Sequence, residues 1–247
     1  SNGHVDAAQL VLEKGAEVDR AKKGGFTPLY VACEKGHVDA ARLLLEKGAE
    51  IDKANEWRGS PLFVACKNGR VDAARLLLDK GAEVDQTKED GATPLYVACE
   101  KGHVDAARLL LERGAEVDRA KENGLTPLIT ACHSGHVDAA RLLLDKGAEV
   151  DRAMEGGATP LIIACEKGHV DAARLVLEKG AEVDRAMEGG ATPLFTACFN
   201  GHVDAARLLL DKGADANRAT EKGRTPLGIA QKKGHSAIVA LLKEHQK

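Results

Sequence analysis

Histidine and cysteine are two residue types that can carry proton-transfer, nucleophilic or metal-binding chemistry, and this chain contains both at regular intervals. Both recur in steps of 33 residues or a multiple of 33. Cys33 is followed by His37, and this Cys-x3-His spacing could in principle belong to a zinc site. The recurring residues are Cys33, Cys66, Cys99, Cys132, Cys165 and Cys198, and His37, His103, His136, His169, His202 and His235.

The regular recurrence of these residues argues against a catalytic or metal site. A catalytic centre needs one distinct constellation of side chains, whereas these residues repeat along the chain. Zinc needs four ligands that converge within about 2.0–2.3 Å of the metal. Gly36 interrupts the helix between Cys33 and His37, and the cysteine belongs in the core. We therefore predict no catalytic residue, no metal, no cofactor and no enzyme activity. We expect the histidines to organise a loop, cap the following helix and hydrogen-bond to neighbouring repeats.

The cysteines have a spacing that disfavours disulfides. Equivalent helices of neighbouring repeats pack about 8–10 Å apart, whereas a disulfide needs Cα atoms about 4.4–6.8 Å apart. We expect reduced, buried thiols, which indicates a reducing intracellular compartment such as the cytoplasm. The start of the sequence lacks the layout of a signal peptide.

The prolines follow the same 33-residue period as the cysteines and histidines. All seven follow it: Pro28, Pro61, Pro94, Pro127, Pro160, Pro193 and Pro226. A fixed period of this length is typical of a stacked repeat array. The chain contains 3% aromatic residues, so the core must consist of small aliphatic side chains in closely packed helices.

Charge and hydropathy exclude two classes of partner. The net charge is -3, with both signs mixed among 30% charged residues, which gives no long-range attraction to nucleic acid or an anionic membrane. No run of 18 apolar residues exists, so no membrane span is expected.

The repeat divides residues 1–247, which we treat as a single domain. Residues 1–21 hold a partial first repeat, residues 22–219 hold six full repeats, and residues 220–247 form a more polar C-terminal capping repeat. The front end has no comparable cap, so exposed Leu10 and Val11 predict weak end-to-end association of an otherwise monomeric protein.

Each repeat has clear helix signals. Thr27 is a suitable N-cap, and Pro28 at the first helical position loses no hydrogen bond. Gly36 ends this helix, and His37 opens a second one that runs to Gly48. Both helices have about ten residues, too few for stability in isolation, so each pair must be stabilised by its neighbours. The turn between repeats is predicted to be hairpin-like.

The motifs Thr-Pro-Leu-x-x-Ala, Gly-His-Val-Asp and Leu-Leu-Leu-x-x-Gly-Ala-x-Val-Asp, at period 33, resemble the ankyrin repeat over essentially the whole chain. The resemblance implies an all-α solenoid of stacked antiparallel helix pairs with hairpin-like fingers. It also implies a concave face, made of fingers and first helices, that binds other proteins. The histidine that follows Thr-Pro-Leu in the family is replaced here, for example by Tyr30 and Phe63.

Positions that break the repeat are the candidates for recognition, because identical positions cannot distinguish one repeat from another. Trp57 and Phe199 are the strongest candidates for contact with a partner, since aromatic anchors dominate interfaces. Drift without a role, or local packing, remains the alternative for all of them. Arg58 replaces a glycine, and we expect its finger to have a different backbone. The candidates are Trp57, Phe199, Asn200, Lys67, Asn68, His133, Ser134, Arg58, Lys23, Phe26 and Leu125.

The sequence thus predicts a non-enzymatic module that binds a protein partner through the concave face and the finger tips. The near identity of the repeats supports an alternative, a designed or consensus-type ankyrin scaffold whose main property is folding or self-assembly, with no natural ligand.

Overall fold

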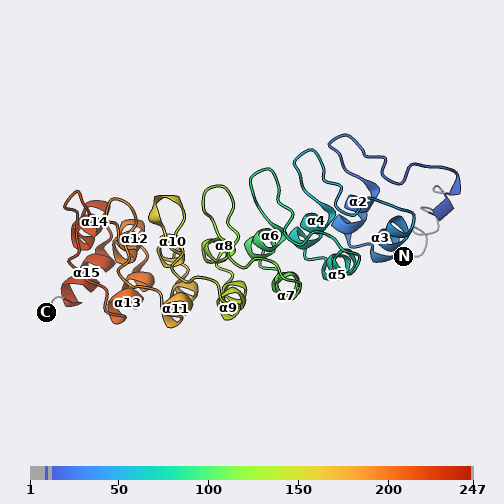
Figure 1. Ribbon diagram of the computed structural model, residues 1–247. Coiled ribbons are helices and arrows are strands. Elements are labelled where there is room, and N and C mark those ends of the chain that lie inside the picture. Colours follow the sequence, from blue (N-terminus) through green and yellow to red (C-terminus); the bar gives the residue numbers. More distant parts are fainter. Residues whose placement is uncertain (1–8, 11–12, 246–247) are drawn as a thin grey trace. The chain divides into compact units, whose positions relative to one another are not determined.

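The computed structural model describes residues 9–10 and 13–245, and this part of the chain is an all-α array of stacked helix pairs. It divides into two compact units, residues 1–122 and 123–247. The described helices of the first unit are α2 to α7, and those of the second are α8 to α15 (Figure 1). No helix in the described ranges is long and apolar enough to cross a membrane.

The first helix of each repeat begins at a proline. A Thr or Ser side chain precedes it and accepts a hydrogen bond from a backbone N–H in the first turn, as Thr27 does from Tyr30. These helices are α2 (Pro28–Lys35), α4 (Pro61–Lys67), α6 (Pro94–Glu100), α8 (Pro127–Ser134), α10 (Pro160–Lys167), α12 (Pro193–Asn200) and α14 (Pro226–Lys233). The predicted N-cap and N1 chemistry is confirmed.

The second helix of each repeat starts directly after the histidine position. It places alanine and leucine in the core, as Ala41 and Leu44 do in the first case. These helices are α3 (Val38–Glu46), α5 (Val71–Asp79), α7 (Val104–Glu112), α9 (Val137–Asp145), α11 (Val170–Glu178), α13 (Val203–Asp211) and α15 (Ser236–His245).

Stacking within each unit follows one rule. A first helix packs on the second helix of its own repeat and on the first helices before and after it, as α4 packs on α5, α2 and α6. In the second unit, α10 packs in the same way on α11, α8 and α12. Fully buried leucines such as Leu62 and Leu161 fill the space between these helices. Each short helix therefore gains its stability from its neighbours, as the sequence predicts.

The finger loops between repeats project together on one side of each unit (Figure 1). A backbone hydrogen bond closes several of the fingers, for example from the N–H of Lys22 to the oxygen of Phe26 at 3.0 Å. One finger contains the short 3-10 helix η1 (Glu155–Gly157). Below the fingers, an Asp carboxylate accepts a backbone N–H from the following repeat, as Asp52 does from Glu83 at 3.1 Å.

Candidate functional site

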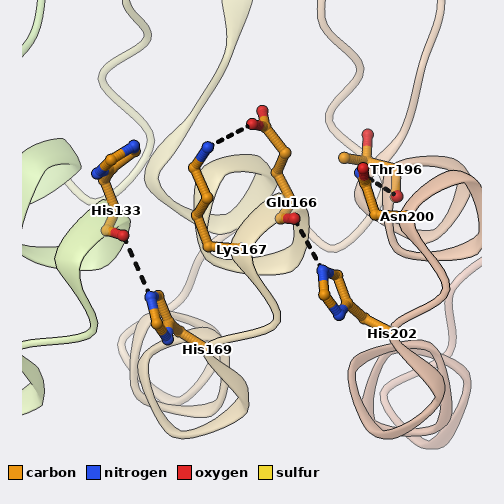
Figure 2. Close-up of polar contacts among 7 residues, drawn as sticks. All are labelled: His133, Glu166, Lys167, His169, Thr196, Asn200 and His202. Atoms are coloured by element: carbon orange, nitrogen blue, oxygen red, sulfur yellow. Dashed lines mark hydrogen bonds and ion pairs between the residues drawn. The ribbon is translucent and has the colours of Figure 1, made fainter.

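The recurring histidines join successive repeats. His202 Nε2 lies 2.9 Å from the backbone oxygen of Glu166, and His169 Nε2 lies 3.2 Å from that of His133 (Figure 2). A carbonyl oxygen can only accept, so in both rings Nε2 carries the hydrogen and donates. Arg70, which replaces the histidine in one repeat, donates from Nε to the backbone oxygen of Glu34 at 3.3 Å. The predicted hydrogen-bond link between neighbours is therefore confirmed.

The second expected role of the histidines, capping the following helix, is wrong. His37, His103, His136, His169 and His202 each hold the N-cap position, but no side-chain hydrogen bond caps the helix. The rings of His169 and His202 instead turn toward the preceding repeat, where a backbone carbonyl accepts their hydrogen. No group of three or more His, Cys, Asp or Glu side chains suited to a metal ion occurs among the described residues.

A glycine packs against each linking ring. A Cβ added to Gly168 would lie 2.6 Å from His202 Nδ1, and one added to Gly135 would lie 2.8 Å from His169 Nδ1. Both glycines also have a positive φ of 73°, a conformation that side-chain-bearing residues rarely adopt. These glycines therefore end the first helix and make room for the ring.

All six cysteines are free and buried. Burial raises the pKa of the Cys33, Cys99, Cys132 and Cys198 thiols to about 12, and it also raises that of Cys66 and Cys165. A thiol held neutral in an apolar core is a poor nucleophile and a poor metal ligand. The cysteines act as small core residues.

Trp57 is half exposed at the tip of its finger, with 50% of its surface accessible. Its ring lies 5.7 Å from that of half-buried Phe26, which in turn lies 5.2 Å from Tyr30. These three aromatic side chains, from two neighbouring repeats, form one row in the first unit. Such a row offers a rigid, partly accessible apolar surface.

Arg58 does not change the backbone of its finger, so that expectation is wrong. Its φ is 58°, in the left-handed region that glycine occupies at the equivalent positions 25 and 91. The turn also keeps its two backbone hydrogen bonds, from Asn55 to Gly59 at 3.0 Å and from Arg58 to Asn55 at 2.9 Å. The Asn55 side chain supports the turn by accepting from the N–H groups of Trp57 and Gly59. The strain is carried by Arg58 itself.

The effect of Arg58 is on the spacing to the next finger. Successive fingers are joined by a backbone bond, such as Glu56 to Gly24 at 3.1 Å and Glu122 to Asp90 at 3.2 Å. Among the described residues, the equivalent bond from Glu89 to Trp57 is missing. A Cβ on Gly25 would lie 2.9 Å from the next finger's backbone, and Arg58 has a real Cβ at this position. A cavity of about 370 Å³ lies here, lined by Trp57, Lys88, Glu89, Asp90 and Glu122.

The residues that break the pattern at the ends of the first helices have mixed environments. Phe199 is 39% exposed, and Lys233 Nζ lies 4.1 Å from the centre of its ring. Asn68 and Asn200 donate their side-chain amides to the backbone oxygens of Val64 and Thr196 in their own helices. The last of these bonds is drawn in Figure 2.

The other candidates differ in accessibility. Lys23, Lys67 and His133 are exposed, and Ser134 is half-buried. Leu125 is half-buried against a core cluster that includes Ile129 and Ile162. Packing accounts for Leu125 more directly than recognition does.

Two cavities occupy equivalent positions three repeats apart, one in each unit. The lysine cavity of the first unit has a volume of about 200 Å³ and is lined by Phe63, Lys67, Lys88, Asp90, Ala92, Tyr96, Val97, Glu100, Lys101 and Lys121. The Phe199 cavity of the second unit has a volume of about 270 Å³ and is lined by Glu166, Ala191, Phe195, Thr196, Phe199 and Asn200.

Sequence reasoning missed Lys88 and Lys121. Lys88 Nζ lies 5.6 Å from the centre of the Phe63 ring, and Lys121 Nζ lies 5.4 Å from that of Tyr96. The sequence contains a signal that could have found them: this finger position differs between repeats, with lysine at 88 and 121 and methionine at 154 and 187.

Leu10 is exposed, with 57% of its surface accessible, whereas Val11 lies outside the described residues. A further cavity of about 310 Å³ in this part of the first unit has mainly apolar walls, including Phe26, Pro28, Val31 and Leu44.

Comparisons with known proteins agree with this architecture. The family described as "Ankyrin repeats (3 copies)" matches residues 1–55, 51–121, 117–187 and 183–247, so the chain belongs to the ankyrin repeat family. The crystal structure of the human ASB11 ankyrin repeat domain is similar, with 33% sequence identity and a TM-score of 0.81 over 89% of this chain and 97% of that one. No curated protein matches the sequence. Ankyrin repeat domains generally mediate protein–protein interactions and are typically not catalytic.

Proposed function

We propose that the chain is a non-enzymatic module that binds a protein partner through the face formed by its first helices and finger tips. The observation that carries the proposal is the placement of its exposed aromatic side chains. Among the described residues, the large exposed apolar side chains are Leu10, Trp57 and Phe199; Trp57 lies at a finger tip of the first unit, and Phe199 lies near the end of a first helix of the second. Aromatic residues that are accessible and held by neighbours make good interface anchors.

The surroundings of both anchors support binding without much reorganisation. Trp57 packs on Phe26, and the Phe199 ring is covered on one side by Lys233. Side chains that are held in place before binding lose little conformational entropy when a partner arrives. The buried neutral thiols agree with a protein that works in a reducing compartment.

Affinity capture from a cell lysate tests the proposal. The wild-type chain is compared with a Trp57→Ala, Phe199→Ala double variant and with a Lys80→Ala control, because Lys80 is exposed at the end of a second helix. The double variant should lose most of the captured partner and the control should retain it. Equal capture by all three would refute the proposed face.

A second candidate function is a scaffold with no natural ligand. The observation that favours it is the near identity of the second helices, since α3 and α7 share the sequence VDAARLLLE and α5, α9 and α13 share VDAARLLLD. Capture of no partner, together with a very high unfolding temperature, would support this alternative.

Weak end-to-end association of the chain is a separate proposal that rests on exposed Leu10. Sedimentation that stays monomeric at every concentration would argue against it.

A further inference from the structure

Four lysines and two carboxylates line the lysine cavity of the first unit. Two of the lysines have a carboxylate partner, since Lys121 pairs with Asp90 at 3.4 Å and Lys101 pairs with Glu100 at 3.2 Å. Lys67 and Lys88 form no ion pair with any described residue. Four lysines against two carboxylates leave the lining with a net charge of +2.

The positive charges of two of these lysines act on Asp90, a carboxylate of the cavity lining. Partial burial alone would raise the pKa of Asp90. The Ala92 N–H and the positive charges of Lys88 and Lys121 outweigh this effect and lower the pKa of Asp90 below its usual value. The aromatic walls hold two of these cations in place: the ammonium groups of Lys88 and Lys121 lie over the rings of Phe63 and Tyr96. A carboxylate that enters would meet fixed cations at a partly desolvated place, where charge-assisted bonds are stronger than in water.

The equivalent cavity of the second unit shows whether the lysines belong to every repeat. Its lining replaces Lys67 with Glu166, Glu100 with Phe199 and Lys101 with Asn200, and Met187 stands at the finger position equivalent to Lys88. No lysine lines it. The same place in the fold is thus lined by four lysines in one unit and by none in the other, so the lysines are a property of this repeat and not of the architecture.

We propose that the lysine cavity receives an Asp or Glu side chain from an extended segment of the partner protein, with the carboxylate held between Lys67 and Lys88. The proposal rests on the proposed function and names the chemistry of the partner. The cavity beside Trp57 shares Lys88 and Asp90 with the lysine cavity. A segment that places its acidic residue in the lysine cavity therefore passes Trp57, which accepts a neighbouring apolar side chain.

Selection from a phage-displayed library of random 12-residue peptides tests this inference. The full chain should enrich peptides with an excess of Asp and Glu beside an apolar residue. The affinity of the enriched peptides is then measured through the fluorescence of Trp57, which is the single tryptophan of the chain. Their affinity should fall as salt is added, because exposed charge pairs are screened.

The decisive variant is Lys67→Glu, Lys88→Met, which installs the side chains that the second unit already accommodates at these positions. Binding of the acidic peptides should weaken by roughly tenfold or more, because the carboxylate loses both of its cationic partners. The matched control Lys80→Glu, which reverses an exposed charge away from the cavity, should leave the affinity unchanged.

Enrichment of neutral or basic peptides, enrichment of none, or equal affinity for wild type and the double variant would each overturn the inference. Neutral or basic peptides that still change Trp57 fluorescence would leave the proposed binding face intact. Peptides that bind a Trp57→Ala, Phe199→Ala variant as tightly as wild type would contradict that face as well; this comparison is made by isothermal titration calorimetry, because the variant contains no tryptophan.

Discussion

His202 donates the hydrogen of Nε2 to the backbone oxygen of Glu166, 2.9 Å away in the preceding repeat. The bond satisfies a carbonyl near the end of α10 that the short helix does not use itself. It also explains why histidine recurs without a reaction centre, since the ring serves the contact between repeats.

His202→Ala should lower the stability of the second unit by about 1–2 kcal/mol, because the Glu166 carbonyl loses its partner and packing is lost. His202→Arg should be milder, since Arg70 already makes the equivalent bond to Glu34. Thermal unfolding of the three proteins measures the difference. An arginine variant as unstable as the alanine variant would contradict the assigned role.

Gly168→Ala should destabilise the protein by about 2 kcal/mol or more, because the added Cβ would lie 2.6 Å from the His202 ring and φ is positive. Gly180→Ala is the control: its φ is also positive, at 94°, but nothing lies within 4 Å of the added Cβ. The difference between the two unfolding midpoints gives the cost of the collision alone. Equal midpoints would show that the ring moves aside freely.

Arg58→Gly should stabilise the first unit by about 0.5–1 kcal/mol, since glycine adopts the left-handed conformation without steric cost. It should also let the fingers approach, so that the Glu89 N–H bonds to the Trp57 oxygen and gains protection from hydrogen exchange. The reverse change Gly91→Ala should destabilise, because its Cβ would lie 3.2 Å from Lys121. An unprotected Glu89 amide in the Arg58→Gly variant would contradict the account of the gap.

The buried thiols predict a loss of stability in alkali. A Cys99 thiol with a pKa of about 12 in the folded chain and 9.0 when unfolded stabilises the fold fully below pH 9, and this contribution is lost as the pH rises toward 12. Each such thiol should cost about 1 kcal/mol by pH 10. Thermal midpoints measured from pH 7.5 to 10.5 under reducing conditions should fall. They should fall less steeply in a Cys99→Ala, Cys132→Ala variant, and an identical slope would refute this assignment.

The fold could be predicted from the sequence because the signals in each repeat agree with one another. Thr27, Pro28 and Gly36 mark a helix start and end, and their exact recurrence implies stacking. The effect of Arg58 could not be predicted, because it depends on the distance between one finger and the next. The sequence wrongly predicted a different backbone for this finger, and it does not show which neighbour the Cβ of Arg58 meets.

The candidate site was predicted in part for a similar reason. Trp57 and Phe199 stood out as single residues that break the pattern, and both are exposed. Lys88 and Lys121 did not stand out, because lysine is common on surfaces. Their role depends on the rings of Phe63 and Tyr96, which the structure places beside them.

The central claim is that similar repeats hold one another in place while their few dissimilar surface residues carry recognition. The most direct test replaces those residues at the ends of the first helices with the Glu and Lys found there in other repeats, and compares this chain with wild type by unfolding temperature and affinity capture. The replacements are Lys67→Glu, His133→Glu, Phe199→Glu, Asn68→Lys, Ser134→Lys and Asn200→Lys. The account predicts a folded chain, with an unfolding temperature close to wild type, that captures much less of the partner. A folded variant that captures the same partner as strongly as wild type would contradict it.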